Sequence, residues 1–83
     1  MPNLNEPSTV WAAITPSDTV DIPRKMNNLL PTRLYAAGAG DVTVLDADGT
    51  SALFVFAAAE IRDISPTRVM STGTTATGII GLW

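Results

Sequence analysis

The amino-acid sequence predicts an all-β protein, a small antiparallel β-sandwich or barrel of about seven short strands that follows an extended, proline-rich N-terminal arm. Proline gives the first observation: five of the six prolines lie within the first 31 residues, and their close spacing excludes both helix and central strand there. Glycine gives the second, because all six glycines lie from residue 38 onward. In that part, β-branched and aromatic runs alternate with turn residues roughly every 8–12 positions.

We assign residues 1–31 to the arm, which contains one candidate short strand at residues 10–14. Asparagines at positions 3, 5, 27 and 28 favour loops elsewhere in this segment. Such an arm can wrap its own domain or reach across a neighbouring subunit, and the sequence leaves both alternatives open. We assign residues 32–83 to the β-sandwich core.

The core segment divides into short strands separated by turn residues. The dipeptide Asp48-Gly49 predicts a hairpin, because a primed turn needs positive φ. A turn or bulge is expected at 38–40, and a turn or a single helical turn at 57–60. Both sides of the strand at 50–56 carry apolar residues, so we expect a second sheet or another subunit to cover them. The candidate strands of the core are 33–37, 41–46, 50–56, 61–64, 67–72 and 77–82.

The small size of the chain raises the question of what stabilises it. A domain of 83 residues buries only about 60–65% of the surface that its unfolded chain exposes. Small domains therefore often need a disulfide, a metal or a partner subunit. The sequence has no cysteine and no histidine, and charged residues make up only 16% against the roughly 25% of average domains. Oligomerisation is the stabilising device that this composition leaves open.

The sequence offers no catalytic, cofactor-binding or metal-binding residues. Without histidine the commonest general base is missing, and serine chemistry would depend on Lys25, which lies in the proline-rich arm. The 46–49 segment resembles part of a calcium loop, but Val44 and Val55 stand where ligands are needed. The glycines at 38–40 lack the third glycine and the helix of a dinucleotide site. A net charge of −3 argues against nucleic acid, and no apolar run is long enough to span a membrane.

Four residues are candidates for an interface with another subunit or another protein: Trp83, Leu82, Trp11 and Tyr35. Tryptophan and tyrosine dominate the binding energy of many interfaces, although packing in the chain's own core is the alternative for each. Trp83 is the strongest candidate, because the sequence ends on an apolar run and we expect that end to be buried, in the core or against a neighbour. Exposed aromatics near Trp11 or Tyr35 would instead favour recognition of a glycan.

Three segments together resemble a known family. They are residues 14–24 (ITPSDTVDIPR), 32–42 (TRLYAAGAGDV) and 68–83 (RVMSTGTTATGIIGLW). These segments are similar to the small spike-base family found in gene transfer agents and tailed phages of alphaproteobacteria. The similarity extends over roughly residues 14–83, and the first and last segments contribute most to it.

The resemblance implies a non-enzymatic virion protein on the outer surface of the capsid. It implies a homo-oligomeric ring that attaches to the major capsid protein and can seat a fibre or spike protein; a cement or decoration protein is a related alternative. The N-terminal residues lack the basic and apolar regions of a signal peptide, so we expect synthesis in the cytoplasm of the bacterial host. The functional alternative is a receptor- or glycan-binding module of a phage surface appendage.

Overall fold

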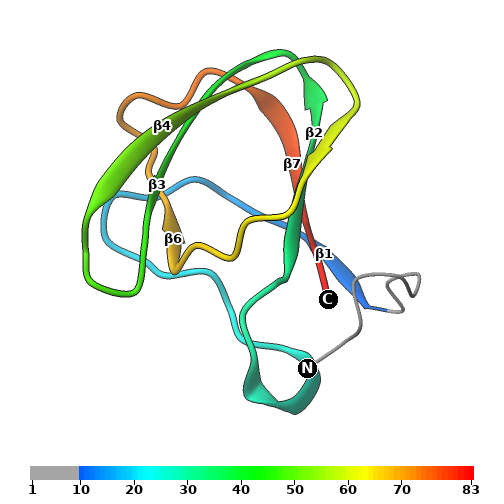
Figure 1. The fold of residues 1–83 in the computed structure, drawn as a ribbon, viewed down its shortest axis with the longest axis vertical. Helices are drawn as coiled ribbons and strands as arrows, with labels where there is room; N and C mark the ends of the chain where they lie inside the picture. The colour runs from blue at the N-terminus through cyan, green and yellow to red at the C-terminus, as the bar shows by residue number, and fades with distance from the viewer. Residues whose placement is uncertain (1–9) are drawn as a thin grey trace.

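The prediction of an all-β fold is confirmed by the computed structural model, which describes residues 10–83 (Figure 1). These residues form two antiparallel sheets and one short 3-10 turn, η1 (Met26–Asn28). The strands of the described chain are β1 (Trp11–Ala13), β2 (Arg33–Gly38), β3 (Gly40–Leu45), β4 (Ser51–Phe56), β5 (Glu60–Arg62), β6 (Arg68–Val69) and β7 (Thr77–Leu82).

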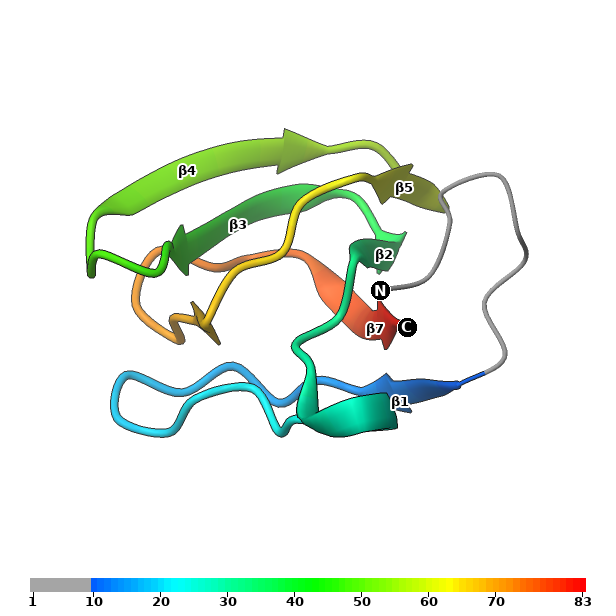
Figure 2. The same ribbon diagram turned by 60° about the horizontal axis from the view of Figure 1, so that its bottom comes forward.

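The two sheets join segments that are far apart in the sequence. The four-stranded sheet has the order β1-β7-β2-β5, and the three-stranded sheet has the order β4-β3-β6. Strand β7, near the C-terminus, lies between β1 and β2, which places the two ends of the described chain side by side (Figure 2). The C-terminal strand is therefore central in its sheet, and its bounds are those that the sequence predicted.

The core lies between the inner faces of the two sheets. Side chains alternate along each strand, so every second residue points inward. The sheet containing β2 and β7 contributes fully or nearly buried residues, and the sheet containing β3 and β4 contributes matching ones. These inward residues are Leu34, Ala36 and Ile79 from the first sheet, and Val42, Val44, Phe56 and Val69 from the second.

The glycine-rich segment at 38–40 carries the chain from one sheet to the other. Strand β2 ends at Gly38 and β3 begins at Gly40, so the predicted turn or bulge is a corner between the sheets. Gly40 has a φ of +153°, and a Cβ there would lie 2.7 Å from the backbone nitrogen of Ala76. Glycine is required here by both the backbone conformation and the close approach of the 75–76 segment.

The hairpin predicted from Asp48-Gly49 joins β3 to β4. The turn itself differs from the expected primed turn: Gly49 has a φ of +84°, whereas Asp48 is not among the residues with positive φ. The Asp46 Oδ1 accepts hydrogen bonds from the backbone nitrogens of Asp48 at 2.8 Å and Thr50 at 3.0 Å. The carboxylate thus stabilises a longer loop in which only the glycine needs a left-handed backbone.

The described part of the arm, residues 10–31, wraps its own domain. Strand β1 pairs with β7, and the backbone nitrogens of Ser17 and Ile22 donate hydrogen bonds to Val69 and Thr67. Ile14 and Ile22 are 6% and 4% exposed and belong to the core. Trp11 and Val20, by contrast, are 65% and 66% exposed, so this part packs on its own domain and still presents apolar side chains that a neighbour can contact. Residues 1–9 of the predicted arm lie outside the described residues.

Two predicted strands are shorter than expected. The segment at 67–72 contributes only Arg68 and Val69 to the second sheet, because the chain beyond Met70 turns and Thr75 binds β3 instead. The segment at 61–64 is a strand only over Glu60–Arg62. The 57–60 segment is a turn, as predicted, with Ala59 at a φ of +59°.

Candidate assembly surface

The sheet containing β1, β7, β2 and β5 has one side packed on the core and one side facing outward. Residues paired across neighbouring strands point to the same side of a sheet. The register aligns Trp11 with Leu82 and Arg33, and it aligns Ala13 with Ile80, Tyr35 and Ile61. We call these seven residues the outer face: Trp11, Ala13, Arg33, Tyr35, Ile61, Ile80 and Leu82.

The outer face is apolar and partly exposed. Trp11 is 65% exposed and Ile61 is 52% exposed, whereas Tyr35, Ile80 and Leu82 are half-buried. Three of the four interface residues proposed from the sequence, Trp11, Tyr35 and Leu82, therefore lie on one surface. Aromatic and aliphatic side chains gathered in this way are typical of protein–protein contacts.

Trp83, the fourth residue, lies on the opposite side and fills the chain's own core. Only 1% of it is exposed, and its indole nitrogen donates a 2.7 Å hydrogen bond to the carbonyl oxygen of Leu29. Because successive residues alternate in direction, Leu82 points outward and Trp83 points inward. This position differs from the interface role that we expected for Trp83, since its side chain leaves almost no surface for a neighbouring subunit.

A second apolar surface lies on β4, outside the four interface residues proposed from the sequence. Leu53 and Val55 are 54% and 61% exposed, so the expected cover by a second sheet is wrong for this side within residues 10–83, and cover by another subunit stays a prediction. Arg62 of β5 contacts the end of β4. Its Nη2 donates a hydrogen bond to the Val55 carbonyl at 2.6 Å, and its guanidinium lies 5.3 Å from the centre of the Phe56 ring. The uninterrupted apolar run at residues 52–56 of β4 was the available signal.

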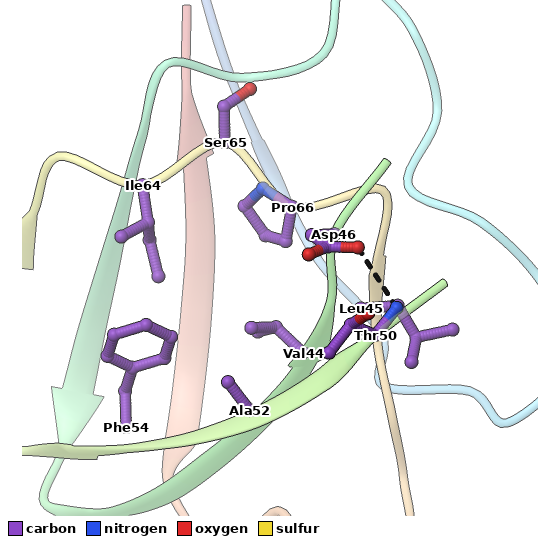
Figure 3. Close-up of a pocket in the computed structure, with 9 residues that line it drawn as sticks. All are labelled: Val44, Leu45, Asp46, Thr50, Ala52, Phe54, Ile64, Ser65 and Pro66. Atoms are coloured by element: carbon purple, nitrogen blue, oxygen red, sulfur yellow. Dashed lines mark hydrogen bonds between the residues drawn. The ribbon is translucent and has the colours of Figure 1, made fainter. Parts of the chain in front are cut away.

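A hollow opens on the inner side of β4, where the first sheet does not extend. It has a volume of 280 Å³ and lies between the hairpin and the 64–66 segment (Figure 3). Its walls are mainly apolar, and Asp46 and Ser65 lie at its edge. We call this feature the β4 hollow; it is lined by Val44, Leu45, Asp46, Thr50, Ala52, Phe54, Ile64, Ser65 and Pro66.

Two carboxylates with lowered pKa values hold loops in place. Hydrogen bonds from the Thr72 hydroxyl at 2.6 Å and the Thr72 backbone nitrogen at 2.9 Å lower the pKa of Asp18. The Ala57 backbone nitrogen, at 2.6 Å, and the Arg62 guanidinium lower the pKa of Glu60. Both groups act as acceptors for backbone and side-chain donors of neighbouring turns, which is a structural task.

Other kinds of site find no support in residues 10–83. Within this range, no group of three or more histidine, cysteine, aspartate or glutamate side chains is placed to hold a metal ion. The same residues contain no helix with the length and apolar character needed to cross a membrane. The surface features that remain are apolar ones, namely the outer face, the exposed side of β4 and the β4 hollow.

Comparison with known proteins identifies a relative. No family model matches the sequence, and no curated protein matches it. Among solved structures, a chain from the "Capsid of native GTA particle computed with C5 symmetry" superposes with a TM-score of 0.85 and 32% sequence identity. The match covers 100% of this chain and 92% of that one. The chain belongs to the same family as that gene transfer agent (GTA) capsid protein.

This family membership covers every element of the described fold. A match over the whole chain means that the overall fold of the described residues also occurs in a chain of a GTA capsid. The fold by itself does not specify a function, so the surfaces must be considered separately.

Proposed function

We propose that this protein is a non-enzymatic structural component of the virion, on the outer surface of a tailed-phage or gene transfer agent capsid. In this proposal it is a cement, decoration or spike-base protein that forms homo-oligomers, attaches to the major capsid protein and can seat a fibre or spike protein. The observation that carries the proposal is the match to a chain of a GTA capsid at 32% identity over the whole sequence.

The surface chemistry supports an assembly role. Protein interfaces that persist are built around buried aromatic and aliphatic anchors, with polar residues at their margins. The outer face offers Trp11 and Ile61 exposed and Tyr35 half-buried between apolar neighbours, and Arg33 lies at its margin. A small domain without disulfides gains stability when such a face is covered by another subunit.

The composition supports a function without catalysis. The sequence has no histidine and no cysteine, and its two carboxylates with lowered pKa values are engaged in turn contacts. A general acid or base works best with a pKa shifted toward neutrality, which is opposite to the direction found for Asp18 and Glu60. We therefore propose no substrate and no cofactor.

Glycan recognition is the second candidate, and the exposure of Trp11 is the observation that favours it. Sugar rings stack on exposed aromatic side chains, and 65% of Trp11 is accessible. Binding of the purified protein to a glycan array would support this candidate, provided that Trp11→Ala abolishes the signal. An array without binding would leave assembly as the role of this face.

The capsid proposal is tested on intact particles from the host. A peptide tag in the exposed 57–59 turn, outside the lining of the β4 hollow, is labelled with gold before and after the particles are opened. We expect the protein to co-purify with particles, and we expect labelling of intact capsids that does not increase on opening. Absence of the protein from purified particles would overturn the proposal, and labelling only after opening would contradict the outer location.

A further inference from the structure

Two complementary features lie at different ends of the molecule. Trp11 projects from β1, the edge strand of the four-stranded sheet, and the β4 hollow lies beside the 46–50 hairpin. Both ribbon views place β1 and this hairpin far from each other (Figures 1 and 2). One chain therefore cannot insert its own Trp11 into its own hollow, whereas a second copy can supply it.

The size and lining of the β4 hollow suit a single large apolar side chain. Its 280 Å³ lies just below the roughly 300–1,000 Å³ of typical small-molecule sites. Val44, Phe54, Ile64 and Pro66 form apolar walls, and the Asp46 carboxylate is a polar group at the edge, whereas the Ser65 hydroxyl points away from the hollow. An indole matches this arrangement, because it combines a large apolar ring with one N–H donor.

The charges of the two ends are opposite. Arg33 lies on the same face as Trp11. Lys25 lies in a turn with Leu29, whose carbonyl oxygen accepts the hydrogen bond from the Trp83 indole. The backbone nitrogen of Trp83 donates to Val10 at the start of β1, so this turn lies at the same end of the molecule. Arg24 precedes Lys25, so three of the five cations of the chain belong to this end. The other two, Arg62 and Arg68, lie elsewhere in the fold, where they form ion pairs with Glu60 and Asp21.

Around the hollow, the charges are negative. Asp46 lines it, Asp48 lies on the same hairpin loop, and Asp63 precedes the lining residue Ile64. None of these three carboxylates forms an ion pair within residues 10–83. Complementary potentials of this kind favour one relative orientation of two subunits and disfavour contacts between like ends.

We infer that Trp11 of one copy occupies the β4 hollow of the next copy, in a head-to-tail contact between the basic and acidic ends. The inference rests on the proposed function, because it identifies the subunit contact of the proposed homo-oligomer. The contact uses two different patches of the same chain, so it is heterologous and produces a closed ring when the rotation between copies closes. The occupant is thus a second copy of this chain.

Cross-linking between two single-cysteine variants tests the contact, because the natural sequence contains no cysteine. Ala13→Cys places a thiol beside Trp11 on the exposed side of β1, and Ser65→Cys places one at the edge of the hollow. The two variants, one of them carrying a mass tag, are mixed and treated with a bismaleimide, which spans more than a disulfide allows. We expect the 13–65 product to exceed the 13–13 and 65–65 products.

Two further variants test the role of the indole and of the hollow. Trp11→Ala in the Ala13→Cys chain should lower the 13–65 yield at least about tenfold, as for an interface hot spot. Ala52→Trp fills the hollow and should lower the yield similarly, whereas Ala47→Trp, on the exposed loop outside the lining, should leave it unchanged. Circular dichroism of each variant establishes that it is folded.

The outcomes distinguish this inference from the proposed function. The reaction is run on the purified protein and on particles assembled from both variants. A dominant 13–13 product would overturn the inference in favour of a symmetric contact, and a 13–65 yield insensitive to Trp11→Ala would overturn the role of the indole. The inference would also be overturned if the 13–65 product formed neither in the purified protein nor in particles, or if residue 13 became linked only to the capsid protein. If the purified protein gives the 13–65 product but is absent from particles, only the proposed capsid role is overturned.

Discussion

The indole nitrogen of Trp83 donates a 2.7 Å hydrogen bond to the carbonyl oxygen of Leu29. The backbone nitrogen of Trp83 donates to the carbonyl oxygen of Val10 at 2.8 Å, and Thr32 donates to the neighbouring Leu82 carbonyl at 2.9 Å. Trp83 and Leu82 therefore hydrogen-bond the start of β1 and the 29–32 segment to the end of β7. Its burial stabilises the single chain before any subunit contact forms.

The two tryptophans should respond oppositely to truncation. Trp83→Ala removes a side chain that is 1% exposed, so we expect it to lower the free energy of unfolding by about 3–5 kcal/mol. Trp11→Ala, at 65% exposure, should change it by less than about 0.5 kcal/mol when measured on the monomer. Urea denaturation followed by circular dichroism measures both. Equal effects of the two substitutions would contradict the assigned burial.

The hydrogen bond of Trp83 can be separated from its packing. Trp83→Phe keeps most of the buried ring but leaves the Leu29 carbonyl without its donor, which should cost about 1–3 kcal/mol. Removal of both Leu82 and Trp83 should destabilise the fold more than Trp83→Ala does, because β7 then loses its pairing with Trp11 and Arg33. A folded, monomeric protein after this deletion would show that the terminal residues serve only association.

Glycine at the corner between the sheets should be harder to replace than glycine in the hairpin. A Cβ at Gly40 would lie 2.7 Å from the Ala76 nitrogen, whereas a Cβ at Gly49 would meet nothing within 4 Å. We expect Gly40→Ala to cost about 1–3 kcal/mol of unfolding free energy or to prevent folding. Gly49→Asn should be nearly neutral, because asparagine tolerates the left-handed conformation. Thermal unfolding compares them; similar melting temperatures would contradict the close approach at Gly40.

The lowered pKa values of Asp18 and Glu60 predict a loss of stability in acid. Each carboxylate is held below its ordinary value of 3.8 or 4.5, so its stabilising contribution is fully present above that value. The contribution is lost as the pH falls through the lower folded-state pKa. Glu60→Gln should therefore flatten the dependence of the melting temperature on pH below about pH 4.5. An unchanged pH profile in Glu60→Gln would contradict the hydrogen bond from Ala57 and the pairing with Arg62.

The sequence predicted the strands better than it predicted which side of each strand is buried. The alternation of residues and the turn signals located the hairpin and the bounds of β7. In the C-terminal strand, however, Ile79 and Ile80 are adjacent, as are Leu82 and Trp83, so the apolar pattern does not distinguish the two faces. A shift of one residue in register reverses them. Pairing with β1 and β2 decides that Ile79 and Trp83 point inward.

The arm and the assembly surface could be predicted only in part. Proline spacing indicated an extended segment, but Ile14 and Ile22 are isolated apolar residues whose burial depends on contacts with distant strands. Residue type alone suggested Trp11, Tyr35 and Leu82, and it is the register of three strands that brings them onto one face. The β4 hollow has no sequence signal, because its walls come from two strands and a linker.

Polar substitution on the outer face should weaken association without unfolding the subunit. Ile61 is 52% exposed and aligned with Tyr35, so Ile61→Asp places a charge at the β5 edge of the face at a cost in monomer stability of less than about 1 kcal/mol. Buried without a partner, the same charge should weaken association at least about tenfold. Val20→Asp is the matched control, because Val20 is 66% exposed and lies away from this face, in the 14–22 loop. Sedimentation equilibrium measures association, and an identical response of the two variants would show that the outer face takes no part in assembly.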